Sequence, residues 1–325
     1  MRTRPPLKRS RLALLTAGAA TLAVTTALVL PQSAGAAETT PVGFGAGTTG
    51  GGSATAVTVT TLAAFKTAVT GDTAKVVKVS GLISLSGQVD LGSNTTVLGV
   101  GSASGFTGGG LRLKKVTNVV VRNLNISKPV APADGITVQA STKVWIDHNA
   151  FSSDLDHGKD YYDGLVDITH ASDYVTLSWN TFKDHYKGSL VGHSDSNASE
   201  DTGHLRVTYH HNWFNNVNSR TPSLRFGTGH FYDNYVVGAD TAVHSRMGAQ
   251  MLVENNVFRS TSVAVTTNRD SDVDGYANLT GNDLGGAATE ISQVGTFTKP
   301  PYSYTAEPAS TVVASVTSGA GTGKL

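Results

Sequence analysis

Five stretches of this 325-residue chain share one pattern: VWIDHNAF at 144–151, VTLSWNTF at 175–182, VTYHHNWF at 207–214, GHFYDNYV at 229–236 and MLVENNVF at 251–258. In each stretch an asparagine is followed two positions later by Phe or Val. The asparagines recur at intervals of 31, 32, 22 and 22 residues, as Asn149, Asn180, Asn212, Asn234 and Asn256. Short strands and turns that repeat about every twenty residues predict a parallel β-solenoid, an all-β fold. In it the asparagines would bond from rung to rung as a ladder.

The chain around the repeats also favours short strands. Residues 60–70 carry Leu62, Phe65 and Val69 at helical spacing after a possible cap, Thr60 or Thr61, and we expect the only helix of the chain there. The Gly-rich residues 40–57 predict a loose lead-in. A β-sandwich is the competing fold, but it gives no reason for the fixed asparagine register. Further β-type runs lie at 76–79, 96–98, 119–121, 144–146, 175–177 and 207–209.

Composition limits the function. The chain has 25 basic and 24 acidic residues and no Cys, and 39% of it is hydrophobic, which is enough for a large core. All five charges before Ala37 are basic, so the remainder holds 25 − 5 = 20 basic against 24 acidic residues. This balance argues against a nucleic-acid partner. Without disulfides, stability has to come from the core, regular hydrogen bonding or bound ions.

The first 36 residues resemble an export signal. A basic start precedes an apolar stretch at 12–30, then Pro31 and the small-residue triplet at 34–36. The apolar stretch is nearly long enough to span a bilayer, but its threonines and the triplet favour cleavage before Ala37. We therefore expect residues 1–36 to be a secretory signal peptide and 37–325 to be one secreted, extracellular domain without a membrane partner. The signal lacks paired arginines, which favours the general secretory route.

The ten histidines do not predict a zinc site. His210 and His211 are adjacent and should point to opposite faces of a strand. No His-x-x-x-His helix is present, and we expect His148, His185 and His211 to pack or bond in turns. The chain also lacks a phosphate-binding glycine loop and a Gly-x-Ser-x-Gly elbow.

Three aspartates are better candidates for a site. Asp163 and Asp167 flank Gly164 in DGLVDIT, and Asp134 in ADGIT lies one repeat earlier. Equivalent positions in neighbouring rungs stack about 5 Å apart, so the three carboxylates could converge on one face. Their mutual repulsion would be relieved by a hard cation such as Ca²⁺. The alternative is that the Asp-Gly pairs only make turns.

Basic residues follow the aspartates at comparable spacing. Lys187 comes twenty positions after Asp167, and Arg220 and Arg225 lie one or two rungs further on. Pro222 separates the two arginines, so the chain is expected to turn there. The three cations could form structural ion pairs with the carboxylates. They could equally line a groove that holds a calcium-bridged anionic ligand.

A family resemblance favours the groove. VWIDHNAF, DGLVDITHASDYVTLSWNTFKDHYKGSLVG at 163–192 and above all VTYHHNWFNNVNSRTPSLRFGTGHFYDN at 207–234 resemble signature blocks of secreted pectate lyases of polysaccharide lyase family 1. The likeness extends over about residues 60–258. It implies a right-handed parallel β-helix with a groove along one face and calcium-dependent β-elimination of polygalacturonate. With it we expect a monomer that carries a short N-terminal capping helix.

The resemblance also assigns roles by motif position. Asp134, Asp163 and Asp167 match calcium ligands, Lys187 and Arg225 match binders of substrate carboxylates, and Arg220 matches the proposed base. Trp145, Asp147 and His148 match a block that is mainly structural. Some relatives carry another acidic residue where this chain has Pro132, so calcium affinity or stoichiometry is expected to differ.

Two alternatives stay open at this point. Pectin lyases, which act on methylated polymer, replace the calcium carboxylates, whereas this chain keeps all three. A noncatalytic β-solenoid that binds polysaccharide would not need Arg220. Arginine is normally protonated well above neutral pH, so a base at Arg220 predicts a rate that rises into the alkaline range.

Overall fold

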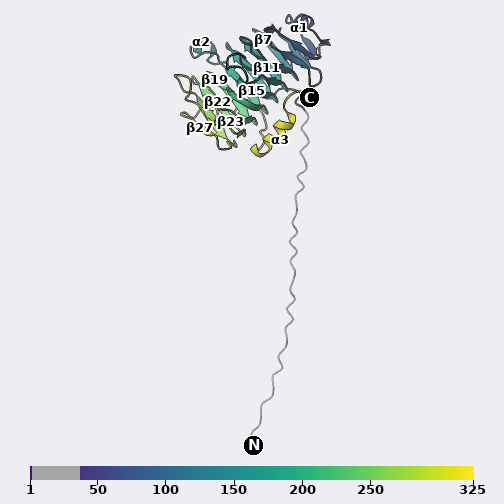
Figure 1. Cartoon of the computed structure of the whole chain (residues 1–325). Coiled ribbons are helices and arrows are strands. Elements are labelled where there is room, and N and C mark those ends of the chain that lie inside the picture. Colours follow the sequence, from purple (N-terminus) through teal and green to yellow (C-terminus); the bar gives the residue numbers. More distant parts are fainter. Residues whose placement is uncertain (2–36) are drawn as a thin grey trace. The chain divides into compact units, whose positions relative to one another are not determined.

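Strands dominate the computed structural model, which describes Met1 and residues 37–325 (Figure 1). The rest of the expected signal peptide lies outside the described residues. Sheet A has ten strands in the spatial order β1 (Ala56–Val59), β2 (Lys75–Val79), β5 (Thr95–Gly99), β8 (Thr117–Arg122), β11 (Thr142–Asp147), β14 (Asp173–Ser178), β17 (Arg206–His210), β20 (Thr228–Tyr232), β23 (Gln250–Glu254) and β26 (Tyr276–Thr280). All six β-type runs noted in the sequence lie in strands of sheet A.

Sheet B holds seventeen strands. They are β3 (Leu82–Ser84), β4 (Gln88–Asp90), β6 (Gly105–Thr107), β7 (Gly110–Lys114), β9 (Asn125–Ser127), β10 (Ile136–Gln139), β12 (Ala150–Ser152), β13 (Val166–Thr169), β15 (Thr181–Lys187), β16 (Ser189–Val191), β18 (Trp213–Ser219), β19 (Ser223–Arg225), β21 (Tyr235–Val237), β22 (Thr241–Arg246), β24 (Val257–Arg259), β25 (Val263–Thr266) and β27 (Ala288–Glu290).

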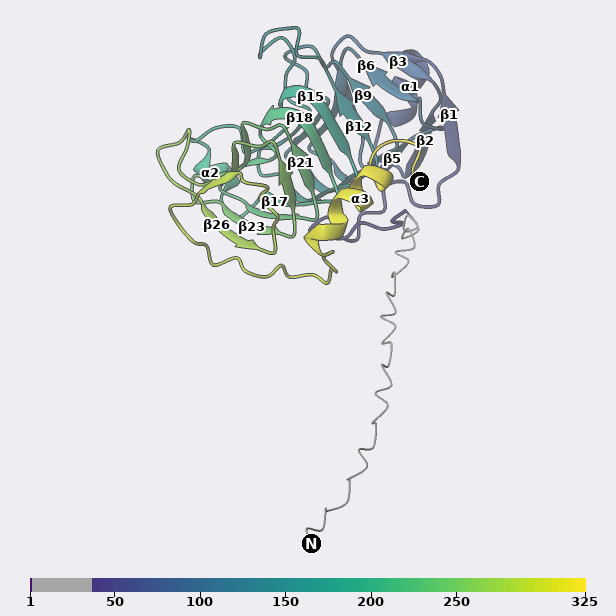
Figure 2. The same cartoon turned by 60° about the horizontal axis from the view of Figure 1, so that its bottom comes forward.

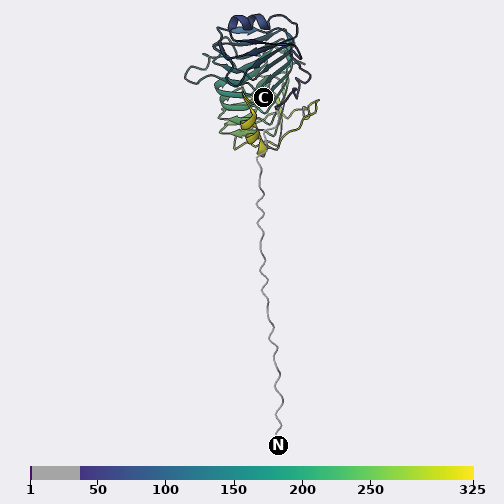
Figure 3. The ribbon, with the colours of Figure 1, turned by 90° about the vertical axis from the view of Figure 1, so that its right-hand side faces the viewer.

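The chain alternates between the two sheets as it climbs. One turn runs through β13, β14 and β15, and each strand pairs in parallel with its equivalent in the next turn. Val144 of β11, for example, pairs with Val175 of β14, which pairs with Val207 of β17. Figure 3 shows the resulting stack of rungs. The expected parallel β-solenoid is confirmed.

The asparagine ladder forms as expected between sheet A and the strand that follows. The side-chain Oδ1 of Asn180 accepts from the backbone N of Asn149 at 2.9 Å and from its Nδ2 at 3.0 Å. The same two contacts join Asn180 to Asn212, Asn212 to Asn234 and Asn234 to Asn256. Every buried amide in the ladder therefore has a partner, which stabilises a turn that would otherwise leave polar groups unpaired.

The residue two positions after each ladder asparagine belongs to the core. Phe151, Phe182 and Phe214 are fully buried, and their rings stack with centroids 4.9 and 4.5 Å apart. Parallel pairing continues this row through Val236 to Phe258. One row of large side chains thus runs along the inside of the solenoid, where burial of each contributes about 1.5–3 kcal/mol.

The helices lie at the end and on the side of the stack. α1 (Leu62–Val69) is capped by the Thr61 hydroxyl, which accepts from the backbone N of Ala64, and it buries Phe65 and Val69 at the N-terminal end of the solenoid. The expectation that it would be the only helix was wrong. α2 (Ala198–Asp201) is one short turn, and α3 (Ala309–Gly319) packs against β21 and β24 (Figure 2). α3 is built largely from Ala, Ser, Thr and Val, which are not strong helix formers apart from Ala.

Both terminal segments are tied to the solenoid. The lead-in expected to be loose is fixed on sheet A, because the backbone N of Phe44 donates to Thr208 at 3.0 Å and that of Gly45 to Thr176 at 2.9 Å. At the other end, the backbone N of Gly323 donates to Asn123 at 2.7 Å, a residue 200 positions earlier. Over residues 37–325 we find no helix long and apolar enough to cross a membrane.

Candidate active site

The three aspartates converge on one glycine at the start of neighbouring sheet B strands. The backbone N of Gly164 donates to Oδ1 of Asp134 at 3.0 Å and to Oδ1 of Asp163 at 3.1 Å. Asp167, in β13, approaches the same glycine so closely that a Cβ there would lie 2.4 Å from its Oδ1. Any larger residue at 164 would push one of these carboxylates away. The sequence prediction that the three lie together is thus matched by their geometry.

Their electrostatics call for a positive charge. Burial raises the pKa of Asp134 to about 8, and the nearby carboxylate of Asp167 adds to the shift. Burial also raises the pKa of Asp167 to about 6, although the guanidinium of Arg220 opposes it. The chemistry of this oxygen-rich set fits a hard dication. Within residues 37–325, however, no three His, Asp or Glu side chains are arranged so that they could hold a metal ion, and this includes the three aspartates.

Lys187 lies beside the aspartates at the end of β15. Its Nζ is 3.1 Å from Oδ1 of Asp160 and 3.3 Å from Oδ1 of Asp163. Asp163 therefore has a cationic partner within the chain, which is one of the structural ion pairs that the sequence left open. The bonded ammonium of Lys187 in turn holds the pKa of Asp160 below its usual range.

His185 contacts the backbone of Asp163. Its Nε2 donates to the backbone O of Asp163 at 2.6 Å. Burial lowers the pKa of His185 to about 4, so the ring is neutral at physiological pH. This histidine lies in strand β15 and not in a turn as expected, and its bond fixes the backbone of a site residue.

Arg220 stands at the sharp turn between β18 and β19. Its backbone has φ +60, and its carbonyl accepts from the N of Ser189 at 2.6 Å. The carbonyl also lies 2.6 Å from where a Cβ of Gly188 would be, so this close approach requires glycine at 188. The guanidinium is partly exposed and makes no hydrogen bond or ion pair with any residue of 37–325. The charge of Arg220 acts on both Asp160 and Asp167.

Arg225 follows in β19, on the next part of the same face. Its Nε pairs with Asp195, and its Nη1 donates to the backbone O of Gly192 at 2.7 Å. Arg225 is in register with Arg246 of β22. Burial and the charge of Arg225 lower the pKa of Arg246 to about 10. The face thus changes from carboxylates to guanidinium groups over successive rungs, which suits an anionic polymer held jointly by a cation and by arginines.

Four residues around the site were missed from the sequence: Asp160, Asp195, Arg246 and the supporting role of His185. Asp160 lies in the insertion that lengthens one repeat to 31 residues, and this insertion was the available signal. Asp195 and Arg246 carry no spacing that links them to Arg225. Only the folded register brings them together.

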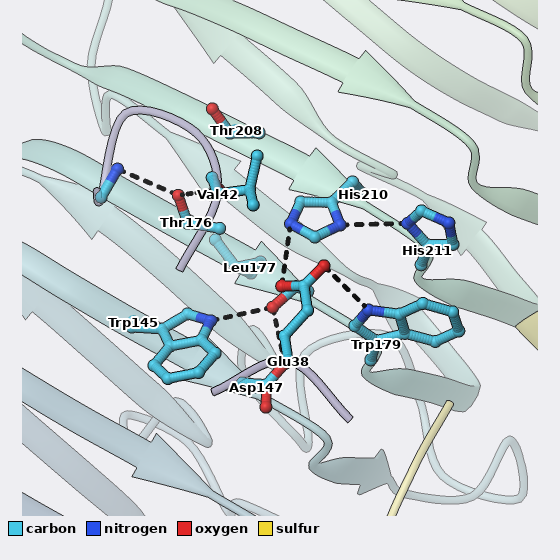
Figure 4. Close-up of polar contacts among 12 residues, drawn as sticks. Glu38, Val42, Trp145, Asp147, Thr176, Leu177, Trp179, Thr208, His210 and His211 are labelled. Atoms are coloured by element: carbon cyan, nitrogen blue, oxygen red, sulfur yellow. Dashed lines mark hydrogen bonds and ion pairs between the residues drawn. The ribbon is translucent and has the colours of Figure 1, made fainter. Parts of the chain in front are cut away.

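A second concentration of titratable side chains lies on sheet A (Figure 4). His210 and His211 do not point to opposite faces as expected: φ of +54 at His211 turns the chain, and their Nδ1 atoms lie 3.0 Å apart. Glu38 from the N-terminal segment accepts from Nε1 of Trp179 at 3.3 Å and lies 3.8 Å from Nε2 of His210. Burial, with the charge of Asp147 second, raises the pKa of Glu38 to about 7. We interpret this cluster as the anchor of the terminal segment.

The expected structural block behaves accordingly. Asp147 is fully buried and accepts from Ser178 at 2.6 Å and from Arg122 at 2.7 Å, while His148 lies 2.6 Å from it. Trp145 donates its Nε1 to Ser178 at 2.9 Å. These residues bond to one another inside the fold.

Comparisons with known proteins agree with this geometry. A family model described as pectate lyase matches residues 9–325. Pectate lyase B of Colletotrichum gloeosporioides is 51% identical over 283 residues, which cover 86% of this chain and 85% of that protein. Pectate lyase A of Aspergillus niger is 49% identical over 277 residues, 85% of this chain and 84% of that protein. A crystal structure of a pectate lyase from Bacillus sp. N165 in complex with trigalacturonate has a TM-score of 0.80 and 33% identity, and covers 87% of this chain and 99% of that one.

The match spans the solenoid and both terminal segments. It includes the strands that carry the three aspartates, Lys187 and the two arginines. The sequence resemblance noted for residues 60–258 is therefore confirmed and extended. This chain belongs to the pectate lyase family.

Proposed function

We propose that this pectate lyase cleaves polygalacturonate by calcium-dependent β-elimination and that Arg220 accepts the proton. One observation carries the assignment of the base. Arg220 is flanked by Lys187 and Arg225, both of which are paired with aspartates, yet its own guanidinium makes no such pair within residues 37–325. A group left free on the groove face is available to a substrate.

The aspartates would hold the metal. Asp134, Asp163 and Asp167 supply carboxylate oxygens around Gly164, as Ca²⁺ prefers. Burial raises the pKa of Asp134 and of Asp167, and a bound cation would favour the ionised form of both. When bound, Ca²⁺ would neutralise a substrate carboxylate and so acidify the proton on the adjacent carbon. Pro132 contributes no carboxylate to this set.

The remaining steps fall to the chain's own cations. Lys187 and Arg225 would hold galacturonate carboxylates and stabilise the negative charge that develops as the proton leaves. Arg220 would take the proton from the carbon next to the uronate carboxylate. The electron pair then forms the carbon–carbon double bond as the glycosidic oxygen departs. A deprotonated guanidine is needed for this role, which favours alkaline conditions.

The predicted export signal and the family also indicate where the protein acts. We infer that residues 1–36 are removed on export and that 37–325 act as a secreted, extracellular monomer on pectin. The complex of the Bacillus relative with trigalacturonate supports an oligogalacturonate ligand.

The decisive assay measures ultraviolet-absorbing unsaturated product from polygalacturonate. We expect activity with Ca²⁺, loss with a chelator and recovery on adding Ca²⁺. Full activity in the chelator would contradict the metal's role. A rate already at its plateau at mildly acidic pH would contradict Arg220 as the base, because a carboxylate base would behave in that way.

A further inference from the structure

Both proposed carboxylate anchors are already occupied by carboxylates of the chain itself. Nζ of Lys187 lies 3.1 Å from Oδ1 of Asp160, and Nε of Arg225 pairs with Asp195. The side chains of Lys187 and Arg225 are only 8% and 11% exposed, whereas those of Asp160 and Asp195 are 86% and 37% exposed. In each pair the aspartate therefore lies on the solvent side of a nearly buried cation.

The two members of each pair are held very differently. Lys187 ends β15 and Arg225 ends β19, and both strands are paired in parallel with neighbouring rungs. Asp160 belongs to the loop between β12 and β13, and Asp195 to the segment between β16 and α2. A loop side chain changes position at much lower cost than a strand built into a ladder. If a ligand competes for the cation, the aspartate is the partner that moves.

Pairing is not the general state of cations on this face. Arg220 lies between the two pairs in sequence and has no acidic partner within the described chain. Arg246 on the same face also lacks a carboxylate partner within residues 37–325 and donates instead to the backbone O of Asp270 at 3.0 Å. The two covered cations are those assigned to substrate carboxylates.

We propose that Asp160 and Asp195 are place-holders: they occupy the positions of two substrate carboxylates, and a galacturonate chain binds by displacing both. This inference rests on the proposed function, because it takes Lys187 and Arg225 as substrate anchors. In this proposal the two aspartates set the affinity for substrate by competing for Lys187 and Arg225. Because each displacement exchanges one ion pair for another, the net gain of substrate binding is smaller than the anchors alone would give.

The test compares Asp160→Asn, Asp195→Asn and the double variant in steady state on polygalacturonate at low ionic strength and saturating Ca²⁺. Removal of an exposed competing charge should lower KM about two- to fivefold for each variant, with kcat unchanged. The reduction should shrink as salt is added, since an exposed ion pair is screened. Asp160→Glu, which keeps the competing charge, should retain the wild-type KM.

Asp156→Asn is the matched control. Asp156 lies in the same loop, is exposed and makes no hydrogen bond or ion pair with any described residue, so the variant changes net charge equally without freeing Lys187. Its KM should stay at the wild-type value. An equal fall in KM for Asp156→Asn would mean that only net charge matters, and would overturn the proposal.

Two other results would also overturn it. An unchanged KM in both single variants would show that the aspartates do not compete with substrate. A higher KM together with a higher Ca²⁺ requirement in Asp160→Asn would make Asp160 a metal ligand. Failure of the proposed function would look different, because the wild-type protein itself would then form no unsaturated product.

Discussion

The solenoid has two series of turns, on different sides, which differ in whether their polar side chains are paired. In the turns after sheet A, one residue type recurs, and each ladder asparagine finds its partners in the rungs above and below. In and just before β10, β13 and β19, the residues differ from rung to rung. There burial raises the pKa of Asp134 and of Asp167, and Arg220 has no acidic partner within residues 37–325. Repetition stabilises the first side, and its absence leaves the second side able to bind.

The largest effect is expected from Arg220→Lys, on the side where residues do not repeat. The variant keeps a cation but loses the planar fork and its position, so kcat on polygalacturonate should fall about a hundred- to ten-thousandfold. Calcium-dependent binding of trigalacturonate, measured by calorimetry, should hardly change. Arg225→Ala should instead weaken binding as well. Equal losses of binding in both variants, with turnover at saturation preserved, would show that Arg220 is only another anchor.

A smaller effect is expected from Asp167→Ala on the same side. Loss of one buried carboxylate from a charged set should weaken calcium binding about thirtyfold or more. Since Asp167 is not part of the hydrophobic core, cooperative thermal unfolding should persist. Calcium titration of activity measures the calcium affinity of the variant, and circular dichroism checks that it is folded. Calcium affinity equal to that of the wild type would exclude Asp167 as a ligand.

On the ladder side, Asn180→Ala should cost stability without touching catalysis. The substitution removes the side-chain hydrogen bonds of Asn180 to Asn149, Ile146 and Asn212 and leaves the buried N–H groups of Asn149 without their acceptor, so the free energy of unfolding should fall by about 3–5 kcal/mol. Asn282→Ala removes the same kind of side chain at the partly exposed last rung and should cost about 1–2 kcal/mol. Similar losses at both positions, measured by denaturant unfolding, would contradict a ladder whose value depends on burial.

The smallest effect concerns Glu38 on sheet A and depends on pH. Its pKa is raised from 4.5 to about 7, so the folded state binds the proton more tightly than the unfolded state. Stability due to this group is present below pH 4.5 and is lost as pH rises towards 7, since the unfolded state ionises first. Asp147 on β11 opposes ionisation of Glu38, whereas the hydrogen bond from Trp179, His211 just after β17 and Arg122 on β8 favour it.

Glu38→Gln should therefore match the wild type near pH 4.5 and exceed its stability at pH 8 by about 1–3 kcal/mol. Denaturant unfolding at the two pH values provides the measurement. A stability difference that stays constant across this range would show that Glu38 does not titrate as inferred.

The two sides of the solenoid also differ in how well the sequence predicted them. The solenoid and its ladder were predictable because Asn149 through Asn256 repeat in one register, and repetition is visible without coordinates. The convergence of Asp134, Asp163 and Asp167 was also predictable, from rung spacing. Asp160 and Asp195 were not, because they reach their cations across loops whose path no local pattern specifies. α3 was missed because its contacts with β21 and β24, more than its own helix propensity, define it.

The C-terminal contact described for Gly323 has a consequence for biosynthesis. Rungs can stack in order while the polypeptide is still being made, since each needs only the one before it. The bond of Gly323 to Asn123, and that of Thr322 to the carbonyl of Ser102 at 3.1 Å, join residues 200 and 220 positions apart and so form only after the later rungs have been made. A product that stops before Thr322 would keep the rungs that contain Ser102 and Asn123 but lack these two bonds. A tag fused after Leu325 would emerge beside the rungs that contain Ser102 and Asn123, which are distant in sequence from the last rungs.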